Sequence, residues 1–325
     1  MASYRRDMLD EKSRELYGIL GAAMAQHEEK VDLGGKYSRD EVYAAFRALK
    51  RYDERLFWVD DRFAVTEGDS SAVISYRYDK DTAASMQSEI DAEAASILAG
   101  TEDMSEGEKV QHIHDELVLR INYGDGEGEN DNDIYGALGL HKCTCQGYAK
   151  AFVYLCRQAG IDAMVVEGVA RDVGDMAIGD HMWDIVSIDG KYYHIDPTWD
   201  DPEDGDRIRY DIYGLDDEEI RRSRTVEEGM PVVDGQAYDW YERNLMCAAN
   251  ADEARDVILR QAEAGEPVLR VRADSKEAAD QIEQEILSGF GEGSLAEILS
   301  SLGMSYENVS YSFNDTDYIF EIYMM

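Results

Sequence analysis

The stretch from His181 to Trp199 constrains the fold of this chain more than any other, because it has the pattern of two strands joined by Asp189 and Gly190. An Asp-Gly pair between alternating apolar runs predicts a two-residue turn, since both turn positions must accept positive φ. A turn of that length leaves one register for the hairpin, which runs outward from the pair Ile188 and Lys191.

That register divides the hairpin into two faces, because successive side chains of a strand point to opposite sides. One face is predicted to face the core and carries Val186, Ile188, Tyr193 and Ile195. The other face carries His181, Trp183, Ile185, His194 and Asp196. On this second face His181 and Asp196 are diagonal neighbours with α-carbons about 7 to 8 Å apart, so we expect their side chains to hydrogen bond.

A helix is predicted to begin at Cys145, because apolar residues then recur at helical spacing as far as Gly160. The unpaired N–H groups and the positive dipole end of a helix start favour a thiolate and can stabilise a developing oxyanion. A thiol, an imidazole and a carboxylate are the parts of a cysteine nucleophile with an oriented base. The sequence therefore predicts one catalytic site from Cys145, His181 and Asp196.

Several motifs resemble, in order, those of the bacterial transglutaminase-like proteins, which share a papain-like cysteine-protease core. They cover about a third of the chain and read IHDELV, YGAL, CQGYAKAF, AGI, DHMWD and YYHIDPTWDD. The resemblance implies Cys145 as nucleophile, His181 as general base and acid, and Asp196 as the group that orients the imidazole. It also implies an α+β fold with the catalytic helix packed on an antiparallel sheet. The family often has Asn where this chain has Asp184, and the register places that side chain on the opposite face, where we expect no effect on catalysis.

Other residues could support or compete with these three. The candidates for the oxyanion site or for support of the triad are Tyr123, Gln146, Trp183 and His194. His194 shares the face of His181 and is the rival base. Cys143 is the rival nucleophile, but it precedes the helix and lacks the Gly-Tyr pair that follows Cys145.

No cofactor and no metal is predicted. A zinc site at His141, Cys143 and Cys145 would rest on a single C-x-C without a second ligand pair, which is weak evidence. The acidic stretches GDGEGENDND and DDPEDGD do not match the EF-hand calcium loop. A surface loop is the simpler interpretation of each, and calcium stays an open alternative.

Composition limits the partners. The chain has 70 acidic and 32 basic residues and a net charge of −38, which argues against binding nucleic acid. It contains no run of apolar residues long enough to span a membrane. The expected partner is a protein or peptide substrate, with a cell-wall peptide as one candidate. The printed chain shows no signal peptide; if it is the trimmed form of an exported protein, we expect an extracellular or cell-surface location.

Four segments are predicted along the chain. An N-terminal subdomain of helices and a β-hairpin spans 1–104, with helices at about 7–30 and 38–50 and a strand pair in LFWVDDRFAV and SAVISYRY. The catalytic core spans 105–215, a linker or helical segment 216–264, and a small α+β domain 265–325.

The predicted activity is acyl transfer or hydrolysis at an amide through a thioester, with hydrolysis favoured. The alternative is a binding or scaffold protein that keeps the fold without turnover.

Overall fold

The structure, a computed structural model, describes residues 10–66, 70–124, 128–171, 178–202, 207–289, 291–304 and 309–324. It divides into two compact units. The first consists of Met1–Gly168, His181–Arg209 and Val226–Asp234. The second consists of Val169–Asp180, Tyr210–Thr225 and Gly235–Met325. Helices and strands are mixed throughout, which confirms the predicted α+β class.

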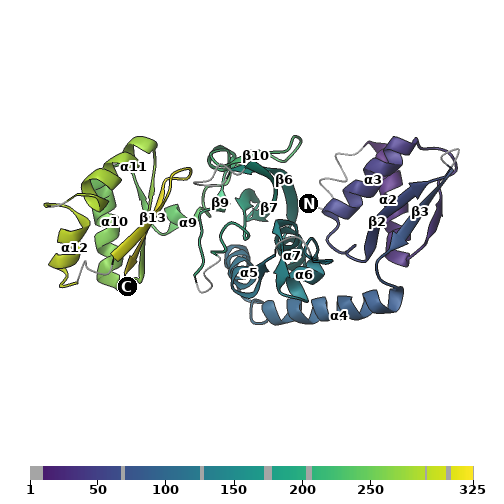
Figure 1. The fold of residues 1–325 in the computed structure, drawn as a ribbon, viewed down its shortest axis with the longest axis horizontal. Helices are drawn as coiled ribbons and strands as arrows, with labels where there is room; N and C mark the ends of the chain where they lie inside the picture. The colour runs from purple at the N-terminus through teal and green to yellow at the C-terminus, as the bar shows by residue number, and fades with distance from the viewer. Residues whose placement is uncertain are drawn as a thin grey trace. The chain divides into compact units, whose positions relative to one another are not determined.

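The first unit begins with two helices and a three-stranded antiparallel sheet of order β1-β3-β2 (Figure 1). Its elements are α2 (Glu11–Gln26), β1 (Lys30–Asp32), α3 (Arg39–Tyr52), β2 (Val59–Val65) and β3 (Ser71–Tyr76). Helix α3 and the β2–β3 pair are as predicted, and Ser38 and Glu41 form a capping box at the start of α3. Strand β1 was not predicted, because three residues are too short to show a period.

The same unit continues with the elements of the predicted catalytic core. They are α4 (Lys80–Ile97), α5 (Glu106–Arg120), β4 (Asn122–Tyr123), α6 (Ile134–Leu138), β5 (Lys142–Cys143), α7 (Cys145–Gln158), β6 (Ala163–Arg171), β7 (Ile178–Ile188) and β8 (Lys191–Ile195). Helix α7 begins at Cys145 as predicted and is buried at every residue from 147 to 156. It packs against α5 and α6. Helix α4 was not predicted, although its buried residues recur at helical spacing.

Strands β6, β7 and β8 are the central strands of a five-stranded sheet of order β10-β6-β7-β8-β9. The β7–β8 hairpin is antiparallel and pairs Ile188 with Lys191 and Asp184 with Ile195, which confirms the predicted register. Both turn residues have positive φ, 51° at Asp189 and 78° at Gly190. The prediction of a single buried face was too narrow, because the side chains of both faces are buried in this sheet.

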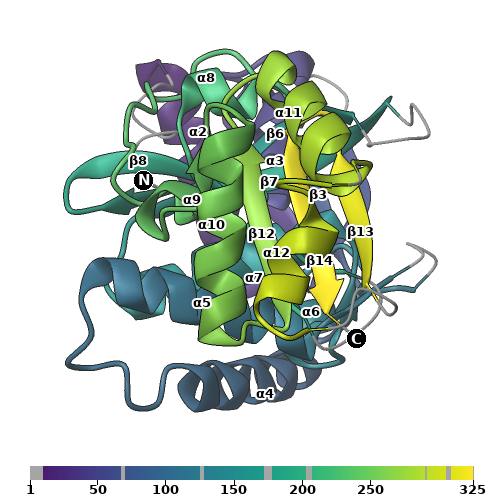
Figure 2. The ribbon, with the colours of Figure 1, turned by 90° about the vertical axis from the view of Figure 1, so that its left-hand side faces the viewer.

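The second unit carries a four-stranded sheet of order β11-β12-β14-β13. Its elements are β9 (Tyr213–Leu215), α8 (Asp217–Ile220), β10 (Arg224–Val226), α9 (Trp240–Arg243), β11 (Cys247–Ala248), α10 (Ala251–Ala264), β12 (Val268–Ala273), α11 (Lys276–Ile282), the π-helical turn η2 (Glu283–Leu287), α12 (Leu295–Ser301), β13 (Val309–Asn314) and β14 (Ile319–Met324). The last residue of β10, Val226, belongs to the first unit. Helices α10, α11 and α12 cover one face of the sheet (Figures 1 and 2). The chain after residue 265 contains both helices and strands, as expected of the α+β segment predicted there, and α10 shares their apolar cluster. The boundaries of the four predicted segments stay predictions.

Candidate active site

The β7–β8 hairpin brings His181 and Asp196 together. His181 lies on β7, and Asp196 directly follows the last residue of β8. The Nε2 atom of His181 is 2.7 Å from the Oδ2 atom of Asp196, within the first unit. This contact is the one that the hairpin register predicted, and it arises because the pleat places diagonal neighbours on one face.

The carboxylate of Asp196 is held in place by two hydrogen bonds. Its Oδ2 atom faces His181, and its Oδ1 atom accepts a hydrogen bond of 3.2 Å from the backbone N–H of Trp199. Asp196 is fully buried and His181 is 8% exposed. Nε2 is the ring nitrogen of His181 that is turned toward the carboxylate.

Aromatic rings surround the imidazole. The ring of Trp183 lies parallel to that of His181 at 6.1 Å, and the ring of Trp199 meets it edge-on at 5.6 Å. The indole N–H of Trp183 donates a hydrogen bond of 3.1 Å to Nδ1 of His194. His194 therefore orients Trp183 through that nitrogen, which fits a supporting role better than that of the rival base.

Cys145 is the first residue of α7 and is half-buried. Thr144 precedes it as the N-cap residue, and its hydroxyl donates to the backbone of Asp131 and the side chain of Asn132 rather than capping the helix. At this helix start the N–H groups of Thr144 and Gly147 bond to the carbonyls of Asp131 and Thr144, which leaves the N–H groups of Cys145 and Gln146 without a backbone acceptor among the described residues. Cys145 lies in the same unit as His181 and Asp196.

The other cysteines are poorer nucleophiles. Burial raises the pKa of the Cys143 and Cys156 thiols well above their usual range. Burial also raises the pKa of Cys247 to about 11, and this residue lies in the second unit. Cys143 packs beside Gly147, where an added β-carbon would come within 2.6 Å of the Cys143 sulfur. The rival nucleophile is thus a core thiol that packs beneath the start of α7.

Residues 92–197, which contain all three predicted catalytic residues, match the family model of the transglutaminase-like superfamily. This region is a transglutaminase-like domain.

Individual relatives match smaller parts of the chain. The kyphoscoliosis peptidases of Homo sapiens and Mus musculus are 35% and 34% identical over 68 residues, which is 19% of this chain and 10% of each peptidase. This chain therefore matches about a tenth of the length of those relatives. Among solved structures, a TGase is 15% identical with a TM-score of 0.34, covering 57% of this chain and 56% of that one. The periplasmic domain of TgpA from Pseudomonas aeruginosa is 18% identical with a TM-score of 0.25, covering 40% of this chain and 53% of that one.

Two contacts fasten the loop that follows Asp196 in the transglutaminase-like domain. Nε2 of His114 lies 3.1 Å from Asp200, and the hydroxyl of Tyr148 donates to Asp201 at 2.5 Å. Burial disfavours a charged His114, but its hydrogen bonds to Asp115 and Asp200 outweigh burial and raise its pKa to about 9. No local sequence pattern predicts this role of His114, because the contact joins residues 86 positions apart.

The two remaining candidates lie near the start of α7. Tyr123 on β4 pairs with Cys143 on β5 and is 50% exposed. Gln146 is the second residue of α7 and lines a cavity on the side of α3. The assignment of either residue to the oxyanion site stays a prediction.

Asp184 lies on the face opposite His181, as the register predicted, but its surroundings are unexpected. It is fully buried, and neither carboxylate oxygen has a hydrogen-bond partner in the part of the chain that the structure describes. Burial, with the negative charge of Asp196 as a second cause, raises the pKa of Asp184 well above its usual range. Burial therefore favours the protonated, neutral form of this side chain.

Several described carboxylates of the acidic stretches have partners within the protein. Asp131 accepts from the N–H of Gly128, and Asp133 caps α6 and pairs with Arg77. Residues 125–127 and 203–206 of these stretches lie outside the described residues. Across the described ranges, no group of three or more His, Cys, Asp or Glu side chains is arranged to hold a metal ion. No helix there combines the length and apolarity needed to cross a bilayer.

Proposed function

We propose that this protein catalyses thiol-dependent acyl transfer or hydrolysis at an amide, with Cys145, His181 and Asp196 as the catalytic triad. The observation that carries the proposal is the 2.7 Å contact between His181 and the fully buried Asp196 in a transglutaminase-like domain whose half-buried Cys145 begins a buried helix. The expected substrate is a glutamine side chain or a peptide bond of a protein or peptide, and a cell-wall peptide is one candidate.

The reaction would begin with proton transfer from the Cys145 thiol to Nδ1 of His181. The thiolate attacks the amide carbonyl carbon and forms a C–S bond, and the N–H groups at the start of α7 stabilise the oxyanion. The imidazolium, held by Asp196, gives its proton to the leaving nitrogen as the C–N bond breaks. Water or an incoming amine then attacks the thioester carbon while His181 accepts its proton; the C–S bond breaks to release the acyl product, and His181 returns the proton to the Cys145 sulfur.

The identity of the acyl acceptor separates two versions of the reaction. Attack by water makes the protein a peptidase or amidase, whereas attack by an amine makes it a cross-linking transferase. We favour hydrolysis as the main outcome. The two versions share every step up to the thioester, so the same three residues serve both.

Thiol alkylation tests the nucleophile. Iodoacetamide labelling, followed by peptide mass spectrometry, should modify Cys145 faster than the other three cysteines. Cys143 and Cys156 are buried, and burial raises the thiol pKa of these two residues and of Cys247. Labelling of Cys145 should slow in His181→Gln, while Cys247→Ser serves as the matched control and leaves it unchanged. Slow and equal labelling of all four cysteines would favour the alternative, a scaffold protein without turnover.

Product analysis tests the reaction. The protein is incubated with a library of glutamine-containing peptides and a labelled primary amine, and the products are read by mass spectrometry. A cleaved or deamidated peptide identifies hydrolysis, and an amine adduct identifies transfer. The proposal fails if wild-type protein and Cys145→Ala give the same products at the same rate.

A further inference from the structure

A cavity of about 620 Å³ lies in the first unit, and its wall includes Gln146 but none of Cys145, His181 and Asp196. Its wall comes from the C-terminal half of α3, the residues near β2 and β3, the turn before α6, and the first turns of α7. Its size is that of a small-molecule site. Gln146 and Lys150 line it from α7, one helical turn apart, whereas Cys145 does not.

The charged residues of the wall are predominantly basic, although the chain as a whole has a net charge of −38. Its five basic residues are Arg47, Lys50, Arg51, Arg77 and Lys150, and its three acidic residues are Asp61, Glu129 and Asp133.

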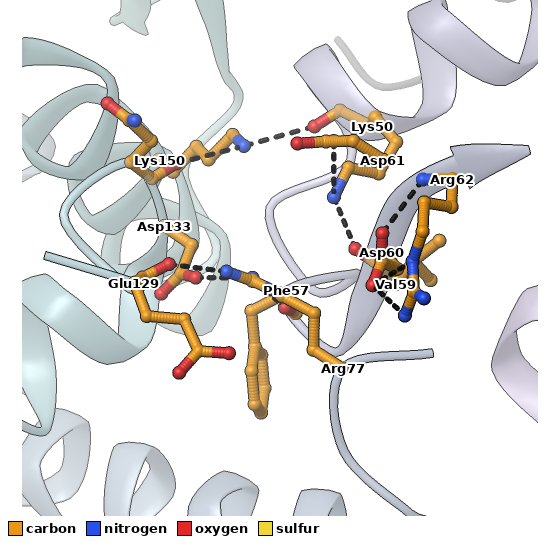
Figure 3. A network of polar contacts seen from close by, with 11 residues as sticks. Lys50, Phe57, Val59, Asp60, Asp61, Arg62, Arg77, Glu129, Asp133 and Lys150 are labelled. Atoms are coloured by element: carbon orange, nitrogen blue, oxygen red, sulfur yellow. Dashed lines mark hydrogen bonds and ion pairs between the residues drawn. The ribbon is translucent and has the colours of Figure 1, made fainter. Parts of the chain in front are cut away.

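Three of these basic residues have carboxylate partners (Figure 3 shows two of the pairs). Arg77 contacts Asp133 at 2.6 Å, and Lys50 contacts Asp61 at 3.2 Å. Arg51 contacts Glu167 at 2.7 Å, outside the wall. Among the described residues, no carboxylate forms an ion pair with the other two basic residues of the wall, Lys150 and Arg47.

Lys150 is the decisive residue. It is 5% exposed, and its Nζ atom donates to the backbone carbonyls of Lys50 at 3.0 Å and Asn132 at 3.4 Å (Figure 3). An ammonium group has three hydrogens, so these two bonds leave one without an acceptor. No carboxylate of the described residues lies within ion-pair distance of Nζ, and a buried ammonium without a counter-charge is costly.

The surrounding charges do not remove this cost. Burial lowers the pKa of Lys150 to about 8; Asp133 and Asp53 oppose that shift, whereas Lys50 and Arg77 add to it. The ammonium is therefore about half deprotonated near pH 8. The two carbonyls could by themselves explain a lysine that caps the end of α3, but they supply dipoles and no negative charge. An anion in the cavity would supply the missing charge and accept the third hydrogen.

We propose that this cavity binds a small oxyanion, the carboxylate or phosphate group of a ligand, with Lys150 as its buried counter-charge. Arg47 at the wall would add a second cation and the Gln146 amide a neutral donor. The proposal does not depend on the activity assigned to Cys145, because the cavity would bind the anion whether or not the triad turns over.

Calorimetry with the full chain tests the proposal at pH 8 and about 0.15 M salt, where the repulsion from the overall negative charge is screened beyond about 8 Å. Succinate and inorganic phosphate are the two probes, each measured in two buffers of different ionisation enthalpy. We expect one of them to bind at a single site with uptake of up to about half a proton, because the anion raises the protonated fraction of Lys150. Lys150→Met, which keeps the length of the side chain, should weaken binding at least tenfold and abolish the proton uptake. Lys36→Met, at a lysine outside the wall, is the matched control.

A second measurement keeps the test valid if Lys150→Met does not fold. The titration of Lys150 in the wild-type chain is followed by NMR of lysine labelled at the ε-carbon. The signal of Lys150 is assigned as one that titrates at lower pH than an ordinary lysine. Its midpoint should move to higher pH when the binding probe is present. Binding of succinate alone assigns the carboxylate source, and binding of phosphate alone assigns the phosphate source. The proposal is overturned if neither probe binds at 10 mM, if Lys150→Met binds with wild-type affinity, or if the midpoint stays where it was.

Discussion

Asp184 offers the sharpest test of the physical reasoning, because it is a fully buried acid whose oxygens have no hydrogen-bond partner in the described structure. Its pKa is raised in the folded state, first by burial and then by the charge of Asp196, while Arg157 opposes the shift. The folded protein thus binds a proton that the unfolded chain releases above about pH 4. Stability is therefore lost as pH rises from there toward the raised folded pKa.

The change to make is Asp184→Asn, which keeps the shape and removes the ionisable group. One proton contributes a slope of about 1.4 kcal/mol per pH unit to the free energy of unfolding. We therefore expect the variant to gain up to about 1.4 kcal/mol on the wild type for each pH unit between about pH 4 and the raised folded pKa of Asp184. The general effect of the net charge of −38 is shared by both proteins and cancels in the difference.

Urea denaturation followed by tryptophan fluorescence at matched ionic strength measures the difference at each pH. Asp189→Asn makes the same chemical change at the exposed turn of the same hairpin and is the control, with an expected effect of a few tenths of a kcal/mol at most. A difference between Asp184→Asn and wild type that does not change with pH would refute the reasoning, because it would mean that Asp184 carries no extra proton in the folded state.

Three further outcomes are expected. In the wild type, protonated His114 contributes about 3 kcal/mol of stability, which is complete below about pH 6.5 and is lost as pH rises through about 9, its raised pKa. His114→Asn should remove this contribution, and urea unfolding measured at several pH values checks it. Gly147→Ala should lower the free energy of unfolding by about 1–3 kcal/mol, because its β-carbon would lie 2.6 Å from the Cys143 sulfur, whereas Gly18→Ala on α2 has no atom within 4 Å and should not lower it. Asp196→Asn should reduce turnover by at least about a hundredfold with little change in substrate affinity, in steady-state kinetics on whichever peptide proves reactive; equal activity would remove Asp196 from the mechanism.

Local patterns predicted much of the transglutaminase-like domain. The Asp-Gly turn set the β7–β8 register, and the register set the contact between His181 and Asp196. The start of α7 at Cys145 followed from apolar spacing in the same way. These predictions succeeded because each depends on residues within one helix or one hairpin, where the backbone period decides which side chains share a face.

Other features of the fold could not be predicted from patterns within one helix or one hairpin. Strand β1 is three residues long and has no sequence period, and the short elements between residues 217 and 248 lie in the segment 216–264, which was expected to be a linker or helical segment. The burial of both hairpin faces was also missed, because a hairpin sequence does not reveal what packs against it.

The sequence by itself determined the hairpin, the helix that carries Cys145 and the two residues that meet across the ladder, since covalent spacing and backbone geometry are enough to place them. Only the tertiary structure decided that His114 holds Asp200 from 86 positions away, that Lys150 of α7 reaches the end of α3 across 100 positions, and that the carboxylate of Asp184 has no hydrogen-bond partner among the described residues. The physical reason is that these groups take their charge state and their contacts from neighbours brought close by packing, and burial depends on the whole fold rather than on any one segment.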